Sequence, residues 1–480
     1  MRVLIISANR NIYPEPVMPA GACIVAEAAQ RHGHDVKLLD LMFERDPVRA
    51  VRRAIKRYRP DATGVSIRNI DNNDISGPAA FYAELGAMSR AIREVSRGPL
   101  IIGGAALSVM PRELLTETGA DLAVLADGER VFPAALQAIA SGKKPDGLKG
   151  TARMENGLSD FGFVSVPALR RPSVPPPAAY ERWLDTRRYL AMLSTAPVLT
   201  KIGCHFECVY CTYRKLPGER PYELMGPAEA AGHIERLSRT GFRDIEFVDN
   251  VFNSPPGHAI SICAEVIKRK TKARLHTIEL NPLFISRELV RAMEKAGFAG
   301  VGITAESASD NVLAGLKKGF GAEHVMKAAQ VLGKSSLPCL WIFMLGGPGE
   351  THKTAAETIR FAQKNLKPQD VAFFNIGVRI YPGTGIEKIA RAVGLLSIAP
   401  REMLAPVFYL SPHIHFERLF RQLEEAIEVN MSFIDIRSMQ SKRLPWIRKA
   451  YGLLGARPPL WRHTAFIRRG LSALGMGGAR

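Results

Sequence analysis

Three cysteines stand close together in the middle of the chain, with the spacing Cys-x3-Cys-x2-Cys. They are Cys204, Cys208 and Cys211, and they follow an apolar run that predicts a β-strand. Thiolates are the usual ligands of iron–sulfur clusters, and a 4Fe–4S cluster normally has four protein ligands. Three cysteines leave one iron open to another ligand. The triad therefore predicts a 4Fe–4S cluster with one open coordination position.

A zinc site completed by His205, which lies between the first two cysteines, is the alternative. Structural zinc sites usually combine two Cys-x2-Cys pairs, and this sequence has no second pair. His205 is then either a hydrogen-bond donor near the cluster or a solvent-facing loop residue. The isolated cysteines, Cys23, Cys263 and Cys339, are expected to be buried small apolar residues, and six cysteines in 480 residues make no disulfide framework.

The elements that position the triad alternate between strands and helices. Residues 195–395 predict six strand–helix units, with strands at 198–203, 244–248, 275–280, 300–305, 340–345 and 371–380. Six such units suit a partial (β/α)6 barrel, short of the eight that close a full one. The triad would then lie in the loop after the first barrel strand. Residues 396–480 predict a helical region with a basic tail.

The first 150 residues also alternate, with strands predicted at 3–7, 35–40, 62–67, 100–104 and 122–126. Strands separated by helices indicate an α/β fold with a doubly wound parallel sheet. Such sheets bind ligands beyond the carboxyl ends of their strands. The candidate ligand-binding residues there are Asn9, Ser66, Arg68, Gly103, Gly104, Gly128 and Glu129.

A proline-rich stretch separates the two α/β units. It contains Pro172 and the run 175–177, which cannot continue a helix or a central strand. We therefore divide the chain into residues 1–150, a linker at 151–194, the barrel at 195–395, and the C-terminal region.

The order of motifs along residues 195–395 resembles that of radical S-adenosylmethionine (SAM) enzymes. The resemblance implies that the open iron binds SAM and that the cluster cleaves it to a 5′-deoxyadenosyl radical. It also implies SAM contacts at positions after successive strands. Tyr210 stands just before the third cysteine, and Asp249 follows the second strand. Glu306 and Ser307 follow the fourth strand and precede the segment Leu316-Lys317-Lys318-Gly319. Gly347 and Glu350 lie in a Gly-Pro-Gly-Glu-Thr turn after the fifth strand, and Arg379 and Tyr381 lie at the end of the sixth.

The N-terminal unit resembles the cobalamin-binding domain that precedes the barrel in one large subgroup of these enzymes. The matching segments include Pro19-Ala20-Gly21, Ile101 to Ala105 and Asp127-Gly128-Glu129. The chain lacks the Asp-x-His-x-x-Gly motif whose histidine ligates cobalt in many cobalamin proteins. The resemblance therefore implies cobalamin without a histidine ligand. His34, at a turn before a strand, is expected to be structural.

The resemblance implies methyl transfer to an unactivated carbon, with SAM serving both as radical source and as methyl donor to cobalamin. Cyclisation or rearrangement without methyl transfer is the alternative within the enzymes, and a regulatory protein that binds SAM without turnover is the alternative outside them. Methylthio transfer is disfavoured, because it needs three more cysteines in the N-terminal unit, which has only Cys23.

Several polar residues near the predicted strand ends have two interpretations. Arg68 and Arg379 would bind a carboxylate of SAM or of the substrate, or form a salt bridge between domains. Tyr381 would accept a proton or pack against neighbours. Glu279 and Asn281 follow the third barrel strand and are candidates for orienting SAM or substrate.

The net charge of +19 and the isoelectric point of about 9.8 indicate an anionic partner or a generally basic surface. Nucleic acid is disfavoured, since no long basic tract or RNA-binding motif is present. No apolar run is long enough to span a membrane, so we expect a cytoplasmic protein. The tail from Ser441 mixes Trp, Phe and Arg, which suits peripheral contact with the inner membrane face or docking on the barrel. The expected partners are a small-molecule substrate, amphiphilic or anionic, and an external low-potential electron donor.

Overall fold

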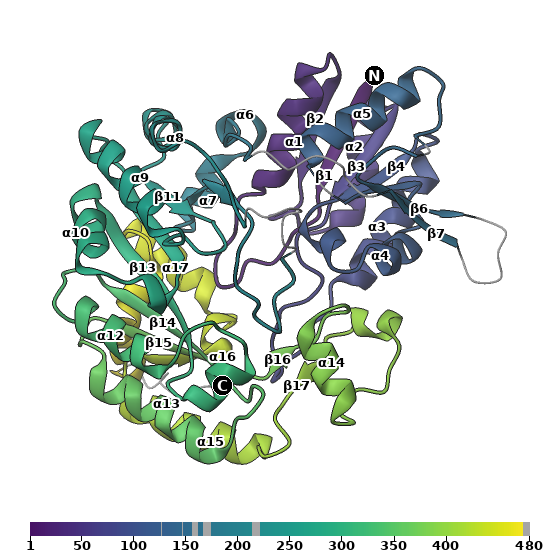
Figure 1. Ribbon diagram of the computed structural model, residues 1–480. Helices are drawn as coiled ribbons and strands as arrows, with labels where there is room; N and C mark the ends of the chain where they lie inside the picture. The colour runs from purple at the N-terminus through teal and green to yellow at the C-terminus, as the bar shows by residue number, and fades with distance from the viewer. Residues whose placement is uncertain (126, 146, 156–161, 167–173, 214–220, 474–480) are drawn as a thin grey trace.

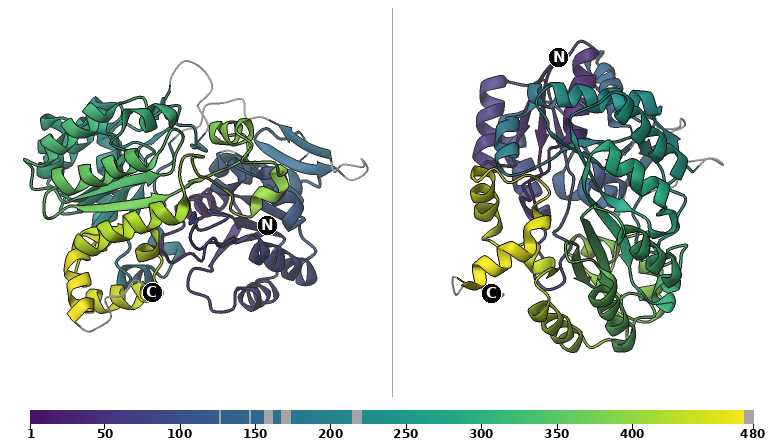
Figure 2. Two further views of the ribbon diagram at one scale, coloured as in Figure 1. Left: turned by 90° about the horizontal axis from the view of Figure 1, so that it is seen from below. Right: turned by 90° about the vertical axis from the view of Figure 1, so that its left-hand side faces the viewer.

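A computed structural model describes residues 1–125, 127–145, 147–155, 162–166, 174–213 and 221–473. Two α/β domains lie side by side, and the C-terminal helices gather beside the barrel (Figures 1 and 2). Both predicted sheets are present, so the predicted fold class is confirmed. No helix among the described residues is long and apolar enough to cross a membrane.

The N-terminal sheet has seven strands in the order β2-β1-β3-β4-β5-β6-β7. Its strands are β1 (Arg2–Ser7), β2 (Asp35–Asp40), β3 (Ala62–Ser66), β4 (Leu100–Gly103), β5 (Leu122–Val124), β6 (Thr151–Glu155) and β7 (Gly162–Val166). The first five pair in parallel, as predicted. Ala126, the last residue of the predicted fifth strand, lies outside the described residues.

Helices cover both faces of this sheet, because its strands are apolar on both sides. They are α1 (Ala20–Arg31), α2 (Pro47–Tyr58), α3 (Tyr82–Val95), η1 (Ala105–Ser108), α4 (Pro111–Thr118) and α5 (Gly128–Ala140). α1 packs with α5, and α2 packs with α3. The Asp46 carboxylate accepts a hydrogen bond from the Arg49 amide, and Pro47 begins the helix, so α2 starts where both residue types favour it.

The stretch predicted to be a linker, residues 151–194, contains two strands and two short helices among its described residues. β6 pairs antiparallel with β5 and β7 with β6, so the sheet continues past residue 150. Two short helices follow, α6 (Tyr180–Trp183) and α7 (Thr186–Ala191). The Tyr189 hydroxyl donates to the Asp40 carboxylate at 2.6 Å, which fixes α7 to the N-terminal domain. Residues 167–173 of the predicted linker lie outside the described residues.

The barrel sheet runs in the order β18-β15-β14-β13-β12-β11-β8, and all its neighbours are parallel. Its strands are β8 (Ala196–Val198), β11 (Asp244–Phe247), β12 (Arg274–Leu280), β13 (Phe298–Glu306), β14 (Cys339–Leu345), β15 (Val371–Ile376) and β18 (Phe433–Asp435). The outer helices are α8 (Pro227–Arg239), α9 (Pro256–Lys268), α10 (Arg287–Ala296), α11 (Asp310–Gly315), α12 (Ala322–Leu332) and α13 (His352–Asn365), and η2 (Pro282–Phe284) follows β12.

Two predicted barrel strands are each divided. The first becomes β8 and the short β9 (Lys201–Ile202), which pairs antiparallel with β10 (Glu223–Leu224). The sixth, predicted as 371–380, ends at Ile376. Gly377 then adopts a φ of 78°, a left-handed conformation in which a strand cannot continue. The chain resumes as β16 (Val378–Arg379), which pairs with β17 (Phe408–Tyr409).

The C-terminal region is helical, as predicted, but also contributes β17 and β18. Its helices are α15 (Phe416–Val429), α16 (Ile436–Met439), α17 (Leu444–Leu453) and α18 (Thr464–Ala473), with η3 (Pro400–Leu404) and η4 (Leu460–His463); α14 (Gly385–Ala392) precedes them. β18 adds a seventh strand to the barrel sheet beside β15.

Cys23, Cys263 and Cys339 are fully buried, as predicted. One apolar cluster joins Met18, Cys23 and Met42 of the N-terminal domain to the barrel interior. The two domains therefore share an apolar core where they meet.

Candidate functional site

The cysteine triad lies on the loop between β9 and β10, at the carboxyl end of the first barrel strand. All three thiols are free and half-buried. Burial raises the pKa of the Cys208 thiol, and the nearby Lys318 ammonium opposes that rise. Among the described residues, no three His, Cys, Asp or Glu side chains could hold a single metal ion.

Asp249 fixes the start of this loop. Its buried carboxylate accepts hydrogen bonds from the Thr200 amide and hydroxyl, both at 2.6 Å, and from the Lys201 amide at 3.1 Å. Lys201 is buried as well, and its ammonium donates to the carbonyls of Phe252 and Ser254, each at 2.7 Å. Asp249, predicted to contact SAM, is thus occupied in holding the residues just before Cys204.

Tyr210, Glu306 and Lys318 meet beneath the triad. The Tyr210 hydroxyl donates to the Glu306 carboxylate at 2.7 Å, and the Lys318 ammonium lies 2.9 Å from that hydroxyl and 3.1 Å from the carboxylate. Glu306 has a φ of 60°, which is costly for a residue with a Cβ and typical of functional sites. Lys318 was not among the predicted site residues, although it lies in the Leu-Lys-Lys-Gly segment that belongs to the predicted SAM-binding motif.

The turn after β14 and the end of β13 are braced by their own side chains. The Glu350 carboxylate is fully buried and accepts hydrogen bonds from the Gly346 amide at 3.3 Å and the Thr354 hydroxyl at 2.6 Å. Burial raises its pKa to about 7. The buried Ser307 hydroxyl lies 3.0 Å from that of Thr358. The side chains of Glu350 and Ser307, both predicted to contact SAM, are thus bonded to other protein groups. Gly347, the third predicted contact here, has no side chain to bond.

Arg379 joins the barrel to the N-terminal domain. Its guanidinium donates to the Asp71 carboxylate at 2.8 Å and to the Met403 carbonyl at 2.7 Å, and both charged residues are buried. The Tyr381 ring packs on this guanidinium, 4.5 Å away. The structure thus matches the interdomain salt bridge and the packing interpretation. Asp71 was not recognised in the sequence.

An apolar cavity of 380 Å³ lies between the N-terminal sheet and the barrel. Five of the predicted cobalamin-binding residues line it: Ser66, Gly103, Gly104, Gly128 and Glu129. A Cβ on Gly104 would lie 2.5 Å from the Ile67 carbonyl oxygen, so only glycine allows this approach. The opposite wall includes Pro197 and Leu199, just before the cysteine loop. The size and apolar lining fit a planar organic group such as the nucleotide tail of cobalamin.

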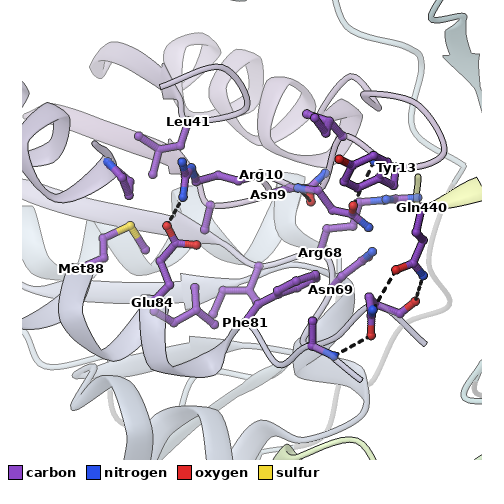
Figure 3. Close-up of a pocket in the computed structure, with 18 residues that line it drawn as sticks. Asn9, Arg10, Tyr13, Leu41, Arg68, Asn69, Phe81, Glu84, Met88 and Gln440 are labelled. Carbon is purple, nitrogen blue, oxygen red and sulfur yellow. Dashed lines mark hydrogen bonds and ion pairs between the residues drawn. The ribbon is translucent and has the colours of Figure 1, made fainter. Parts of the chain in front are cut away.

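The other two predicted cobalamin-binding residues, Asn9 and Arg68, line a separate polar pocket of 320 Å³ on the α3 side of the sheet. Figure 3 shows its amide-bearing side chains and the ion pair between Arg10 and Glu84. The buried Asn9 amide nitrogen has no hydrogen-bond partner within the described chain. Free amide donors of this kind suit the amide side chains of a corrin ring. His34 lies at the opposite end of the sheet, before β2.

Two carboxyl groups of the barrel, one on β11 and one on β12, have raised pKa values. Burial raises the pKa of Glu246 to about 7 and that of Glu279 to about 8. Glu246 accepts a hydrogen bond from the Thr195 hydroxyl at 2.6 Å. Burial lowers the pKa of Arg68, which makes no ion pair with any described residue. Glu246 was not among the predicted site residues, because it lies within a predicted strand and in no motif.

The remaining candidates, His205 and Asn281, have structural partners. His205 is exposed, and its Nδ1 lies 2.7 Å from the Tyr222 hydroxyl. Burial raises the pKa of the Cys204 thiol, while a hydrogen bond from Tyr222 acts against that rise. Tyr222, far from any motif, was also missed. Asn281 is buried and exchanges hydrogen bonds with Asn253, both at 2.9 Å.

Comparison with known proteins finds a family match in each of the two α/β domains. Residues 198–362 match the Radical SAM superfamily and residues 10–136 match the B12 binding domain. A methyltransferase of Pyrococcus horikoshii described as uncharacterized is 26% identical over 82% of this chain and 84% of its own. The tryptophan 2-C-methyltransferase of Streptomyces laurentii is 24% identical over 79% of this chain and 73% of its own.

Among solved structures, the radical SAM methyltransferase TsrM of Kitasatospora setae, with cobalamin and a 4Fe–4S cluster bound, superposes with a TM-score of 0.85 at 21% identity. The superposition covers 99% of both chains, so the two share one fold from end to end. The cysteine triad lies in the domain that matches the Radical SAM superfamily, and the glycine-lined cavity lies against the domain that matches the B12 binding domain. The chain belongs to the radical SAM enzymes that carry a cobalamin-binding domain before the barrel.

Proposed function

We propose that this protein is a cobalamin-dependent C-methyltransferase of the radical SAM type. The observation that carries the proposal is the short segment 197–211. Its first residues, Pro197 and Leu199, line the apolar cavity of the N-terminal domain, and its last ones are the three cysteines. Cobalamin in the cavity and a cluster on the triad would therefore face the same cleft, as a reaction that uses both requires.

When bound, the cluster supplies an electron to SAM and cobalamin carries a methyl group; the electron comes from an external low-potential donor. The chain's own residues hold these groups in place. Tyr210 and Lys318 position Glu306 at the floor of the cleft, and we expect Gly347 and Tyr381 to face SAM. Asp249, Ser307, Glu350 and Arg379 act as positioning residues, because their polar atoms are occupied by protein partners.

The substrate is a small molecule, and we propose that it is anionic or amphiphilic. The Arg68 guanidinium forms no ion pair with a described residue, although the Glu246 carboxyl is near enough to act on its charge, and it is available for an anionic group. The Glu246 and Glu279 carboxyls, with pKa values of about 7 and about 8, would exchange a proton with the substrate near neutral pH, Glu279 chiefly as the donor. Relatives named for methylation at carbon, on tryptophan and on hopanoids, support a carbon target.

Cyclisation without methyl transfer is the second candidate. It is favoured by the likeness to the anaerobic magnesium-protoporphyrin IX monomethyl ester cyclase of Rubrivivax gelatinosus, which is 25% identical over 76% of this chain. The two reactions differ in what becomes of SAM. A methyltransferase converts SAM to S-adenosylhomocysteine when it remethylates cobalamin, whereas a cyclase forms no S-adenosylhomocysteine.

The test is anaerobic reconstitution with iron, sulfide, cobalamin, SAM and a low-potential reductant. We expect about four irons per chain, retained cobalamin, and both 5′-deoxyadenosine and S-adenosylhomocysteine. Cys208→Ser should lose the cluster and both products. Cys263→Ala, a matched change at a buried cysteine outside the loop, should keep them. Formation of 5′-deoxyadenosine without S-adenosylhomocysteine would favour cyclisation, and a cluster that survives in Cys208→Ser would refute the assignment of the triad.

A further inference from the structure

Helix α17 presents an apolar stripe to solvent. Trp446 is 75% exposed, Leu453 is 83% exposed and Leu454 is 82% exposed. Residues spaced by three, four, seven and eight positions share one helix face, so Trp446, Ala450, Leu453 and Leu454 lie together, with the exposed Lys449 beside them. Large apolar side chains grouped in this way mark an interaction surface.

The exposure of this stripe is not a sign of loose packing. Arg448, two residues after Trp446 and so on the opposite face, is only 4% exposed. Its guanidinium donates to the Pro14 carbonyl at 2.8 Å, the Met192 carbonyl at 3.0 Å and the Glu15 carboxylate at 3.0 Å. These bonds hold α17 against the N-terminal domain and α7, and they direct Trp446 outward.

Helix α18 repeats the pattern. Phe466 is 72% exposed, and the exposed Arg469 lies one turn further along the same face. Arg468, two residues after Phe466, turns inward. It donates to the carbonyls of Ile427, Asn430 and Phe433 at 2.8 to 2.9 Å, which fixes α18 to the end of α15. Each helix thus uses one arginine as an anchor and directs an aromatic ring to solvent.

The charge of this region has one sign. Residues 436–480 contain ten Lys or Arg and no Asp or Glu. Exposed cations on α17 and α18, such as Lys449 and Arg469, therefore have no acidic neighbour from their own segment. Cations around aromatic rings at a surface are the pattern of proteins that rest on anionic bilayers, because the rings enter the headgroup layer and the charges attract the lipids.

We propose that α17 and α18 form a peripheral binding surface for anionic lipid. The surface is defined by Trp446, Lys449 and Leu453 of α17, and Phe466 and Arg469 of α18 would add to it. It would hold the enzyme at a membrane, where an amphiphilic substrate is concentrated. This inference does not rest on the proposed methyl transfer, since it concerns residues outside the cleft. Vesicle binding therefore tests it separately from any reaction.

The experiment is co-sedimentation of the full-length holoenzyme with vesicles of phosphatidylcholine alone or of phosphatidylcholine and phosphatidylglycerol in equal parts. We expect binding to the mixed vesicles at low salt, weakened by high salt. Trp446→Ser should weaken it about tenfold, and Lys449→Glu about tenfold or more. The matched controls Leu395→Ser and Lys334→Glu change an exposed apolar residue and an exposed lysine elsewhere, and should bind as the wild type does.

Four outcomes would overturn the proposal. The wild type could fail to bind mixed vesicles at low salt, or Leu395→Ser could weaken binding as much as Trp446→Ser. Trp446→Ser could convert a dimer to a monomer in sedimentation while leaving lipid binding intact, which would make the stripe a contact between two copies. Binding of an RNA oligonucleotide that is as tight as lipid binding, and insensitive to Trp446→Ser, would indicate a general polyanion surface instead.

Discussion

Lys318 and Glu306 form a buried ion pair beside the cluster loop, with side chains that are each 6% exposed. Removing one partner leaves the other charge buried without compensation, which costs about 3–5 kcal/mol. We therefore expect Lys318→Met to lower the free energy of unfolding by about this amount. The double variant Lys318→Met/Glu306→Gln should recover most of the loss, because no unpaired charge remains. Chemical denaturation of the three proteins in one cofactor state measures the coupling, and an additive result would contradict it.

Glu279 predicts a pH dependence of stability. Burial raises its pKa to about 8 from an ordinary value near 4.5, so the folded chain holds this proton more tightly than the unfolded chain. Its contribution to the free energy of unfolding is then full below about pH 4.5 and decreases as pH rises toward 8. Glu279→Gln, which cannot ionise, should gain stability relative to the wild type across that window, by about 1–2 kcal/mol at pH 8.

Denaturant unfolding at pH 5 and pH 8 checks this expectation, with the exposed Glu288→Gln as the matched control. A difference between Glu279→Gln and the wild type that is equal at both pH values would mean that the Glu279 carboxyl titrates normally.

At the scale of single elements, the turn between β4 and η1 makes the sharpest prediction. Gly104 has a φ of 101°, and a Cβ there would lie 2.5 Å from the backbone oxygen of Ile67. We expect Gly104→Ala to cost about 2–4 kcal/mol and to lower cobalamin retention, because the glycine borders the apolar cavity. Unfolding and the absorbance of bound cobalamin after desalting report the two effects.

Gly119→Ala is the matched control for that turn. Gly119 also has a positive φ, of 58°, but nothing lies within 4 Å of its Cβ position. Its substitution should cost only the conformational strain, about 1–2 kcal/mol, and should leave cobalamin bound. Equal losses in both variants would show that the contact with Ile67 relaxes.

Hydrophobic periodicity predicts the regular elements well, because alternating apolar strands and amphipathic helices leave a clear pattern over eleven α/β units. Periodicity fails where a strand pairs with another strand that is distant in the sequence. β18 is a three-residue strand whose partner, β15, is more than fifty residues away, and nothing local distinguishes it from a helix end. The division of the sixth strand depends on Gly377, whose left-handed backbone no periodicity predicts.

The candidate site shows the same limit. The cysteine spacing alone predicts the cluster loop, whereas the motif residues Asp249, Glu350 and Arg379 are occupied by protein partners. A motif marks where a residue lies along the chain but not which way its side chain turns. Asp71, which pairs with Arg379, and Tyr222, which bonds to His205, come from segments that only folding brings together with their partners.

At the scale of the whole molecule, the buried pair of Asp71 and Arg379 ties the domains together. Asp71→Asn leaves the guanidinium without its counter-charge, so we expect a loss of about 3–5 kcal/mol and faster proteolysis between the domains. Small-angle scattering should show a larger radius. The exposed pair Arg52–Glu94 is the control, since its side chains are 43% and 56% exposed and Glu94→Gln should cost under about 1 kcal/mol.

The seventh barrel strand has a consequence for synthesis on the ribosome. β15 ends at Ile376, but its outer edge stays unpaired until residues 433–435 have emerged and formed β18. Until then the edge offers free backbone groups to any neighbouring strand. The Gln440 side chain, which bonds to Asn72, and Arg448, which bonds to Pro14, emerge later still. Gln440 also lines the polar pocket of the N-terminal domain, so the wall of that pocket is completed only after most of the chain has been synthesised.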